Sequence, residues 1–193
     1  MNTLSQEAIR ILNAKHHHPH QWLGMHPGQS EGQSGVFVRA MLNGALACGV
    51  VDLSQDEECR HSLKPLDPAG LFEGFFAHRD DIFPYRLWTQ QANGEYREFY
   101  DPYSFLPTLS EEDLYLFNEG TDRNVYRKLG AHHRTINGIP GVSFALWAPS
   151  AQRVSVVGDF NQWNGCSHPM RAMGSSGVWE LFIPGLDQGA IYK

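Results

Sequence analysis

The sequence predicts an all-β protein made of two tandem β-sandwich modules. Its 193 residues include 19 glycines and 11 prolines, and the periodic segments between them are short, which is typical of chains rich in strands and turns. Several segments alternate apolar with polar residues, as half-buried strands do. Three blocks of sequence also recur in the same order in both halves, which indicates a duplicated sandwich of the immunoglobulin-like kind.

The recurrence aligns one module with the other. Tyr192-Lys193 in the second copy corresponds to Tyr85-Arg86 in the first, and the first copy continues for about two more strands. We therefore expect the second module to be truncated at its C-terminal end. The matching blocks are residues 23–26 with 129–132, 35–40 with 141–146, and 70–75 with 177–182.

Helices are expected outside the two modules. Residues 1–20 form a helix and a lead-in, because a capping box begins at Thr3 and apolar residues then recur on one face. The linker, residues 106–129, is expected to be partly helical, with a helix that begins at Ser110 and ends at Gly120. The expected helical segments are residues 3–14, 110–120 and 124–129.

The first module spans residues 21–105 and the second spans residues 130–193. Asn43-Gly44 and Asn93-Gly94 are hairpin signals in the first module. In the second, residues 142–147 alternate with Val, Phe and Leu on one face. Strands are expected at residues 36–41, 46–51, 71–77, 85–89 and 96–100, and at residues 142–147, 154–157, 169–173, 178–183 and from 191 onward.

Charge and composition exclude several functions. The net charge is −6, the isoelectric point is near 5.9 and no basic block occurs, so no nucleic-acid partner is expected. No apolar run is long enough to cross a membrane, and no signal-peptide pattern occurs at the N-terminus. The three cysteines lack CxxC spacing and indicate reduced thiols in a cytoplasmic protein. No cofactor and no metal are expected, since the histidines at 16, 17, 18 and 20 lack Cys or carboxylate partners at ligand spacing.

The candidate site is the turn Gly158-Asp159-Phe160-Asn161-Gln162-Trp163-Asn164, which lies between two strand patterns. A flat Trp163 ring beside the amides of Asn161 and Asn164 suits a sugar, which has a C–H face to stack and hydroxyls to hydrogen-bond. The alternative is a turn whose Trp folds back into the core.

The other tryptophans are interpreted differently. Trp179 and Trp147 are expected to pack in the core or between domains. Trp22 and Trp88 are possible surface platforms in the first module. That module has no Asn-x-Trp turn, because its matching position reads Val51-Asp52-Leu53-Ser54. The equivalent sugar site is therefore expected to be absent from the first copy.

Taken together, these blocks resemble the amino-terminal half of bacterial 1,4-α-glucan (glycogen) branching enzymes. The second module looks like a carbohydrate-binding module of family 48, and the first looks like the extra amino-terminal module of many bacterial branching enzymes. Phe-x-x-Trp-Ala-Pro and Gly-Asp-Phe-Asn-x-Trp are shared with debranching enzymes, whereas tandem modules are more specific. The resemblance is carried by residues 22–27, 101–105, 126–132, 144–149, 156–163 and 177–185.

The resemblance implies a role in glycogen biosynthesis. In related glucan-binding modules the matching Trp stacks on glucose and the matching Lys, here Lys193, bonds sugar hydroxyls. The family's chemistry lies in an α-amylase-type barrel, which moves an α-1,4-glucan segment to a 6-hydroxyl. That barrel is absent from this sequence, so we expect no catalytic residue here and a role in binding and positioning α-glucan for it.

Two alternatives stay open. The chain could be a structural region that docks on the barrel and binds no sugar. It could also be the amino-terminal half of a related debranching or trehalose-forming glycoside hydrolase, although the tandem modules count against this. Without the barrel, we also expect exposed apolar surface and some tendency to associate.

Overall fold

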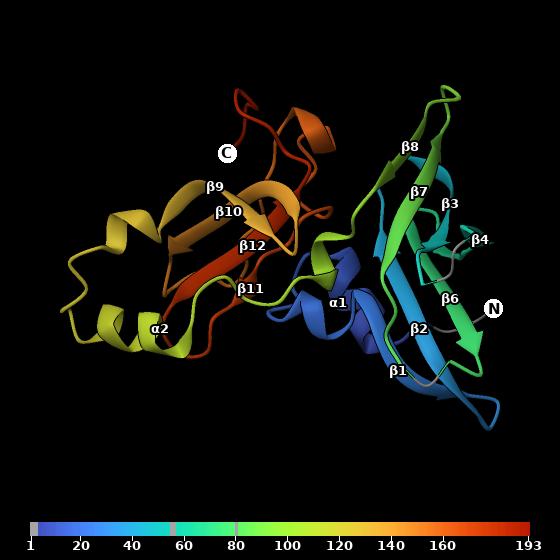
Figure 1. Cartoon of the computed structure of the whole chain (residues 1–193), viewed down its shortest axis with the longest axis horizontal. Helices are drawn as coiled ribbons and strands as arrows, with labels where there is room; N and C mark the ends of the chain where they lie inside the picture. The colour runs from blue at the N-terminus through green and yellow to red at the C-terminus, as the bar shows by residue number, and fades with distance from the viewer. Residues whose placement is uncertain (1–3, 55–56, 80) are drawn as a thin grey trace. The chain divides into compact units, whose positions relative to one another are not determined.

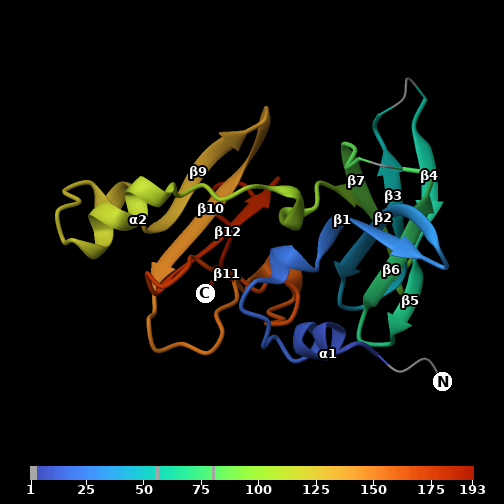
Figure 2. The same cartoon turned by 90° about the horizontal axis from the view of Figure 1, so that it is seen from below.

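The computed structural model describes residues 4–54, 57–79 and 81–193. The chain forms two compact units (Figures 1 and 2). Unit 1 consists of the described residues of Met1–Asn13 together with Pro19–Ser104, and unit 2 consists of Ala14–His18 together with Phe105–Lys193. Both are built mainly from antiparallel strands, which confirms the predicted all-β class.

Unit 1 is a sandwich of two four-stranded antiparallel sheets. One sheet has the order β1-β2-β6-β5 and the other has the order β4-β3-β7-β8. Apolar side chains from both sheets form one core, including Val38 of the first sheet and Val50 and Leu87 of the second. The strands are β1 (Gly24–Ser30), β2 (Gln33–Met41), β3 (Ala45–Asp52), β4 (Cys59–Ser62), β5 (Lys64–Asp67), β6 (Leu71–Ala77), β7 (Tyr85–Gln91) and β8 (Tyr96–Phe99).

The N-terminal helix α1 (Gln6–Leu12) is shorter than the predicted span. Ser5 is its N-cap, and the Ser5 hydroxyl accepts a 3.2 Å hydrogen bond from the Ala8 N–H. The helix ends before Ala14, whose φ of 51° is left-handed. The predicted cap, Thr3, lies outside the described residues.

One of the two predicted hairpins in unit 1 is confirmed and the other is wrong. Asn93-Gly94 joins β7 to β8, which pair directly, and Gly94 has the positive φ, 81°, that such a turn needs. Asn43-Gly44 instead joins β2 to β3, which belong to different sheets. The Leu42 N–H donates to the Gly70 carbonyl at 2.7 Å, so this corner of the chain is tied to β6 rather than closed as a hairpin.

Unit 2 contains one four-stranded sheet with the order β11-β12-β10-β9. Its helix α2 (Glu111–Asn118) confirms the predicted linker helix, and Ser110 and Asp113 form its capping box. Residues 154–157, predicted as a regular strand, are only bridged: Ser155 pairs with Pro169, and the backbone of 154–157 hydrogen-bonds to residues 168, 170 and 193. The other elements are the 3-10 turns η3 (Val125–Arg127) and η4 (Asp159–Asn161), and the strands β9 (Gly130–Ile136), β10 (Ile139–Trp147), β11 (Arg171–Ala172) and β12 (Val178–Pro184).

Strand β10 is buried on both faces, whereas the alternation of apolar residues in its sequence predicted burial of one face only. Val142 and Phe144 face one side, and Ser143 and Ala145 on the other side are equally buried. The second face is covered by the linker, since Leu109 and the partly buried Leu114 and Phe117 of α2 pack in one cluster with Ala145 (Figure 2).

Trp147, at the end of β10, is a further correction to the sequence interpretation. It was expected to be core or inter-domain packing, and instead 58% of it is exposed. Its position two residues beyond Ala145 places it on the linker side of the sheet. There its ring makes an edge contact with Phe117 at 6.2 Å between centroids. Trp179 is 4% exposed, which confirms the packing role predicted for it.

A buried carboxylate attaches the linker to the sheet of unit 2. Glu180 of β12 is fully buried and accepts hydrogen bonds from the N–H groups of Thr108 and Leu109, at 2.9 Å and 2.8 Å. The Arg171 guanidinium donates to the same carboxylate at 2.8 Å and to the Phe105 carbonyl at 3.1 Å. Because buried charges are costly unless paired and hydrogen-bonded, this arrangement fixes residues 105–109.

The histidine-rich segment packs on unit 2. The Ala172 N–H donates to the His17 carbonyl at 2.8 Å, and the His17 ring lies edge-on to Trp179 at 5.8 Å. The His18 N–H donates to His16 Nδ1 at 3.1 Å. Within the described ranges, no group of three or more His, Cys, Asp or Glu residues could hold a metal ion. In the same part of the chain, no helix has the length and apolar character needed to cross a membrane.

Candidate functional site

The candidate turn of unit 2 begins at Gly158, directly after Val157. Residues 159–161 form η4, and the chain then returns so that the Trp163 N–H donates to the Gly158 carbonyl at 2.9 Å. Gln162 and Trp163 both have left-handed backbone conformations, with φ of 55° and 60°. Two consecutive non-glycine residues rarely adopt this conformation, so the turn holds a strained shape.

The Trp163 side chain stands out of the turn in a fixed orientation. Its exposed fraction is 47%, so the ring is not folded back into the core. The indole N–H donates to the Asp159 carboxylate at 2.8 Å, which anchors the edge of the ring. The turn therefore presents an oriented aromatic face with a carboxylate at its edge.

Asn161, expected to offer its amide to a sugar, turns that amide inward. Only 8% of the residue is exposed. Its carbonyl oxygen accepts from the Gly158 N–H at 2.9 Å, and its NH₂ group donates to the Val156 carbonyl at 2.9 Å and to His168 Nδ1 at 2.8 Å. Asn161 thus shapes the turn that carries Trp163.

His168 completes the support below the turn. Because the Asn161 NH₂ group donates to Nδ1, that nitrogen accepts and the imidazole is neutral. Burial lowers the pKa of His168 to about 4, consistent with the neutral form. Its ring also makes an edge contact with Phe160 at 5.5 Å between centroids.

The remaining predicted residues lie at either end of the turn. Asn164 is half-buried, and its side-chain oxygen accepts from the Cys166 N–H at 2.7 Å. Lys193 is exposed, and its backbone exchanges two hydrogen bonds with Val157, of 2.8 Å and 3.0 Å. Because Val157 immediately precedes the turn, the Lys193 backbone is held beside the turn. This placement agrees with the predicted correspondence between Lys193 and Arg86 of the first copy.

Sequence reasoning gave no role to Gly158, Asp159 or His168. Asp159 lies in the predicted turn, but its hydrogen bond to the indole of Trp163 depends on how the turn folds. His168 carried no local signal, because its partner Asn161 is reached by folding. The need for Gly158 follows from space: a Cβ there would collide with the Ile191 carbonyl and lie 2.5 Å from the Phe160 ring.

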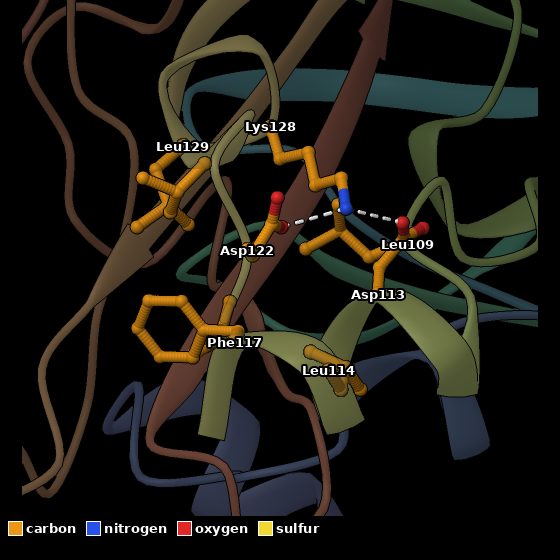
Figure 3. Close-up of a pocket in the computed structure, with 9 residues that line it drawn as sticks. Leu109, Asp113, Leu114, Phe117, Asp122, Lys128 and Leu129 are labelled. Atoms are coloured by element: carbon orange, nitrogen blue, oxygen red, sulfur yellow. Dashed lines mark hydrogen bonds and ion pairs between the residues drawn. The ribbon is translucent and has the colours of Figure 1, made fainter. Parts of the chain in front are cut away.

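Unit 2 also contains a small pocket between α2 and the sheet (Figure 3). Its polar groups are paired with one another, since Lys128 Nζ lies 2.6 Å from the Asp113 carboxylate and 2.7 Å from that of Asp122. Burial alone would raise the pKa of Asp113, but hydrogen bonds from Lys128 and Ser110 lower it to about 2. The pocket therefore belongs to the packing of the linker on the sheet. Apolar side chains line the rest of it: Leu109, Leu114, Phe117, Val125, Leu129 and Val178.

Comparison with known families agrees with this geometry. Residues 128–193 match the family model described as carbohydrate-binding module 48 (isoamylase N-terminal domain), and this range contains the whole candidate turn. The C-terminal third of the chain thus resembles a carbohydrate-binding module. Residues 5–103 match the alpha-1,4-glucan branching enzyme GlgB N-terminal domain, and the chain belongs to this family.

The similar curated proteins are longer than this chain. It is 49% identical over 183 residues to the 1,4-alpha-glucan branching enzyme GlgB of Pseudomonas fluorescens, covering 95% of this chain and 24% of that protein. It is 43% identical to the same enzyme of Cellvibrio japonicus, covering 98% of this chain and 26% of that protein. The chain thus spans about a quarter of these relatives. The chain is also similar to the structure of an Anoxybacillus pullulanase, with 13% identity over 88% of this chain and 23% of that one. The TM-score is 0.28, which is too low to indicate a shared fold.

Proposed function

We propose that this chain binds α-glucan through the turn at residues 158–164 and positions it for a 1,4-α-glucan branching enzyme. The observation that carries the proposal is the exposed Trp163 ring, fixed by its 2.8 Å hydrogen bond to Asp159. A ring held in this way loses little conformational freedom when a sugar stacks on it. The match of residues 128–193 to carbohydrate-binding module 48 supports the same ligand class.

The chemistry of the turn suits a glucose unit. The indole face stacks on the C–H face of the sugar, and Lys193 and Asn164 offer hydrogen bonds to its hydroxyls. Stacking on one ring contributes roughly 1–2 kcal/mol, by analogy with ring pairs and base stacking. A single platform therefore predicts a Kd on the order of 0.1–1 mM for a short maltooligosaccharide. Glycogen binds more tightly, because it offers many equivalent sites on one molecule.

In the whole enzyme, the proposed role of this region is to hold a glucan strand near the catalytic barrel. That barrel cuts an α-1,4 bond with a carboxylate nucleophile and a carboxylic acid, and transfers the segment to a 6-hydroxyl. The residues of this chain contribute binding and orientation and take no part in bond cleavage. Its proposed partners are glycogen and the catalytic barrel of a longer branching enzyme, in the cytoplasm, where free thiols such as those of its cysteines persist.

The test is migration through a native gel with and without glycogen. We expect glycogen to slow the parent chain and Trp163→Ala to lose about tenfold in affinity. Trp147→Ala is the matched control, because Trp147 is an exposed tryptophan of the same unit outside the turn. Circular dichroism checks that both variants fold.

The outcome separates the rival functions. Retardation that disappears in Trp163→Ala and persists in Trp147→Ala supports the proposal. A parent chain that migrates equally with and without glycogen contradicts it, and favours a structural docking region that binds no sugar. Equal loss in both variants would also contradict the assignment to Trp163.

A further inference from the structure

The outer face of one sheet in unit 1 carries a pair of partly exposed rings. Trp88 of β7 and Tyr96 of β8 lie nearly parallel, with 20° between their planes and 6.0 Å between centroids. The neighbouring residue Leu87 of β7 belongs to the sandwich core, so Trp88 faces the opposite side of the sheet. Tyr96 is 48% exposed and Trp88 is half-buried. The two rings form a partly exposed aromatic surface, with the Arg60 guanidinium 5.8 Å from the centroid of the Tyr96 ring.

Both rings are held in place by their neighbours. Trp88 pairs across the sheet with Gly49, and a Cβ at that position would lie 2.4 Å from the indole nitrogen. Glycine therefore allows the ring to rest against the strand. The Tyr96 hydroxyl accepts a hydrogen bond from Arg60 and donates to Glu98 at 2.8 Å. The surface is thus preorganised, which lowers the entropic cost of binding a ligand.

The charges around the rings are balanced. Arg60 pairs with Glu98 at 2.7 Å, and Arg86 pairs with Glu58 at 2.7 Å and with Glu98 at 3.3 Å. Two guanidinium groups and two carboxylates give no net charge, which disfavours a polyanion. They do provide donors and acceptors for hydroxyl groups. Flat rings bordered by such groups fit an uncharged polyhydroxyl chain.

The strand register shows that this face of unit 1 corresponds to the part of unit 2 that carries the candidate site. In unit 1, Asp52 pairs with Tyr85, and in unit 2 the corresponding bridge joins Gly158 to Tyr192. Arg86 is therefore the counterpart of Lys193. Trp88 follows Arg86 by two residues and faces the same side of the strand. Unit 1 lacks the Asn-x-Trp turn, but its strands supply rings on the equivalent face.

From these observations we infer that Trp88 and Tyr96 form a second α-glucan-binding platform, bordered by Arg60, Arg86 and Glu98. The rings stack on successive glucose units, and the charged groups bond their hydroxyls. The choice of α-glucan as ligand rests on the proposed function. The platform itself belongs to unit 1 and is independent of Trp163.

The experiment follows the indole N–H signals of the ¹⁵N-labelled chain during titration with maltoheptaose. The chain has five tryptophans, and Trp→Phe variants assign each signal. We expect the Trp88 signal to shift with a Kd on the order of 0.1–1 mM. Tyr96→Ala should weaken the response of Trp88 by about tenfold and leave that of Trp163 unchanged. Tyr96→Phe keeps the ring and should retain most of the binding.

Tyr126→Ala is the matched control, since Tyr126 is an exposed tyrosine of unit 2 and its loss should change neither response. A Trp88 signal that stays still at about 10 mM maltoheptaose overturns the inference, whatever Trp163 does. A Trp88 shift that survives Tyr96→Ala undiminished also overturns it. If Trp88 responds and Trp163 does not, the inference stands and the proposed site at the turn fails.

Discussion

The two units of this protein share one framework and differ in what they attach to it. The sheet orders β1-β2-β6-β5 and β9-β10-β12-β11 are equivalent, because each places the corresponding strands side by side. Even local contacts repeat. His26 Nε2 lies 2.8 Å from the Leu23 carbonyl, and His132 Nε2 lies 2.9 Å from that of Leu129. The repeated sequence blocks therefore specify the framework.

The two units differ at one equivalent residue at the end of a strand segment and in the chain that follows it. In unit 1 this residue is Asp52, whose buried carboxylate accepts from the Ser54 N–H at 2.8 Å and pairs with Arg79. The Asp52 side chain is buried, and neither Leu53 nor Ser54 after it carries a ring. In unit 2 the residue is Gly158, and the turn that follows holds Trp163 outward. The strand framework is thus present in both units, whereas the candidate site depends on the residue at this position and on the turn that follows it.

The largest expected difference between the units concerns one glutamate position. Glu180 of unit 2 is fully buried and accepts from Arg171 and the linker backbone, whereas its counterpart Glu73 has a side chain 27% exposed and pairs with Arg39 at 2.6 Å. We expect Glu180→Ala to lower the free energy of unfolding of unit 2 by about 3–5 kcal/mol, because it leaves Arg171 buried and unpaired. Glu73→Ala should cost unit 1 about 1 kcal/mol or less.

Urea unfolding followed through indole signals measures both changes, with Trp179 reporting on unit 2 and Trp88 on unit 1. Glu180→Gln provides a second variant, since it keeps the size and loses the charge. Similar losses for Glu180→Ala and Glu73→Ala would show that burial does not separate the two positions.

The same contrast explains what sequence reasoning found. Alternating apolar residues predicted β10, the repeated blocks marked β6 and β12, and the Gly-Asp-Phe-Asn-x-Trp pattern predicted the turn. Strands β4 and β5 were missed because their residues are mostly exposed and polar, so no alternation marks them. The inward amide of Asn161 was also missed, because its partners Val156 and His168 are brought to it only by folding.

Lowering the pH should affect the two units in opposite directions. Burial lowers the pKa of His168 to about 4, so the unfolded chain binds the proton first. The His168 contribution to stability is present above pH 6.5 and is lost as the pH falls toward 4. In unit 1, burial raises the pKa of Asp101 to about 6, despite a 2.6 Å hydrogen bond from the Tyr85 hydroxyl. Its contribution is present below pH 3.8 and is lost as the pH rises through 6.

Between pH 4 and 6 we therefore expect unit 2 to lose, and unit 1 to gain, up to about 3 kcal/mol on acidification. Urea unfolding at several pH values, with the same indole signals, measures both slopes. His168→Gln should flatten the slope of unit 2, and Asp101→Asn should flatten that of unit 1. Slopes of the same sign in the parent chain would contradict the assignment.

The smallest expected difference lies in the turns themselves. Asn161→Ala removes the acceptor of the Gly158 N–H and should cost unit 2 about 1–2 kcal/mol, since a buried donor is left unsatisfied. It should also weaken glycogen binding, because the Trp163 ring loses the turn that orients it. Ser54→Ala is the matched change in unit 1, where the exposed hydroxyl bonds Asp52 at 2.6 Å, and should alter stability by about 0.5 kcal/mol or less. Urea unfolding and glycogen gels compare the two variants. If Asn161→Ala left both stability and binding intact, the turn would hold Trp163 without its amide, and the contrast between the units would rest on Gly158 and Asp159 alone.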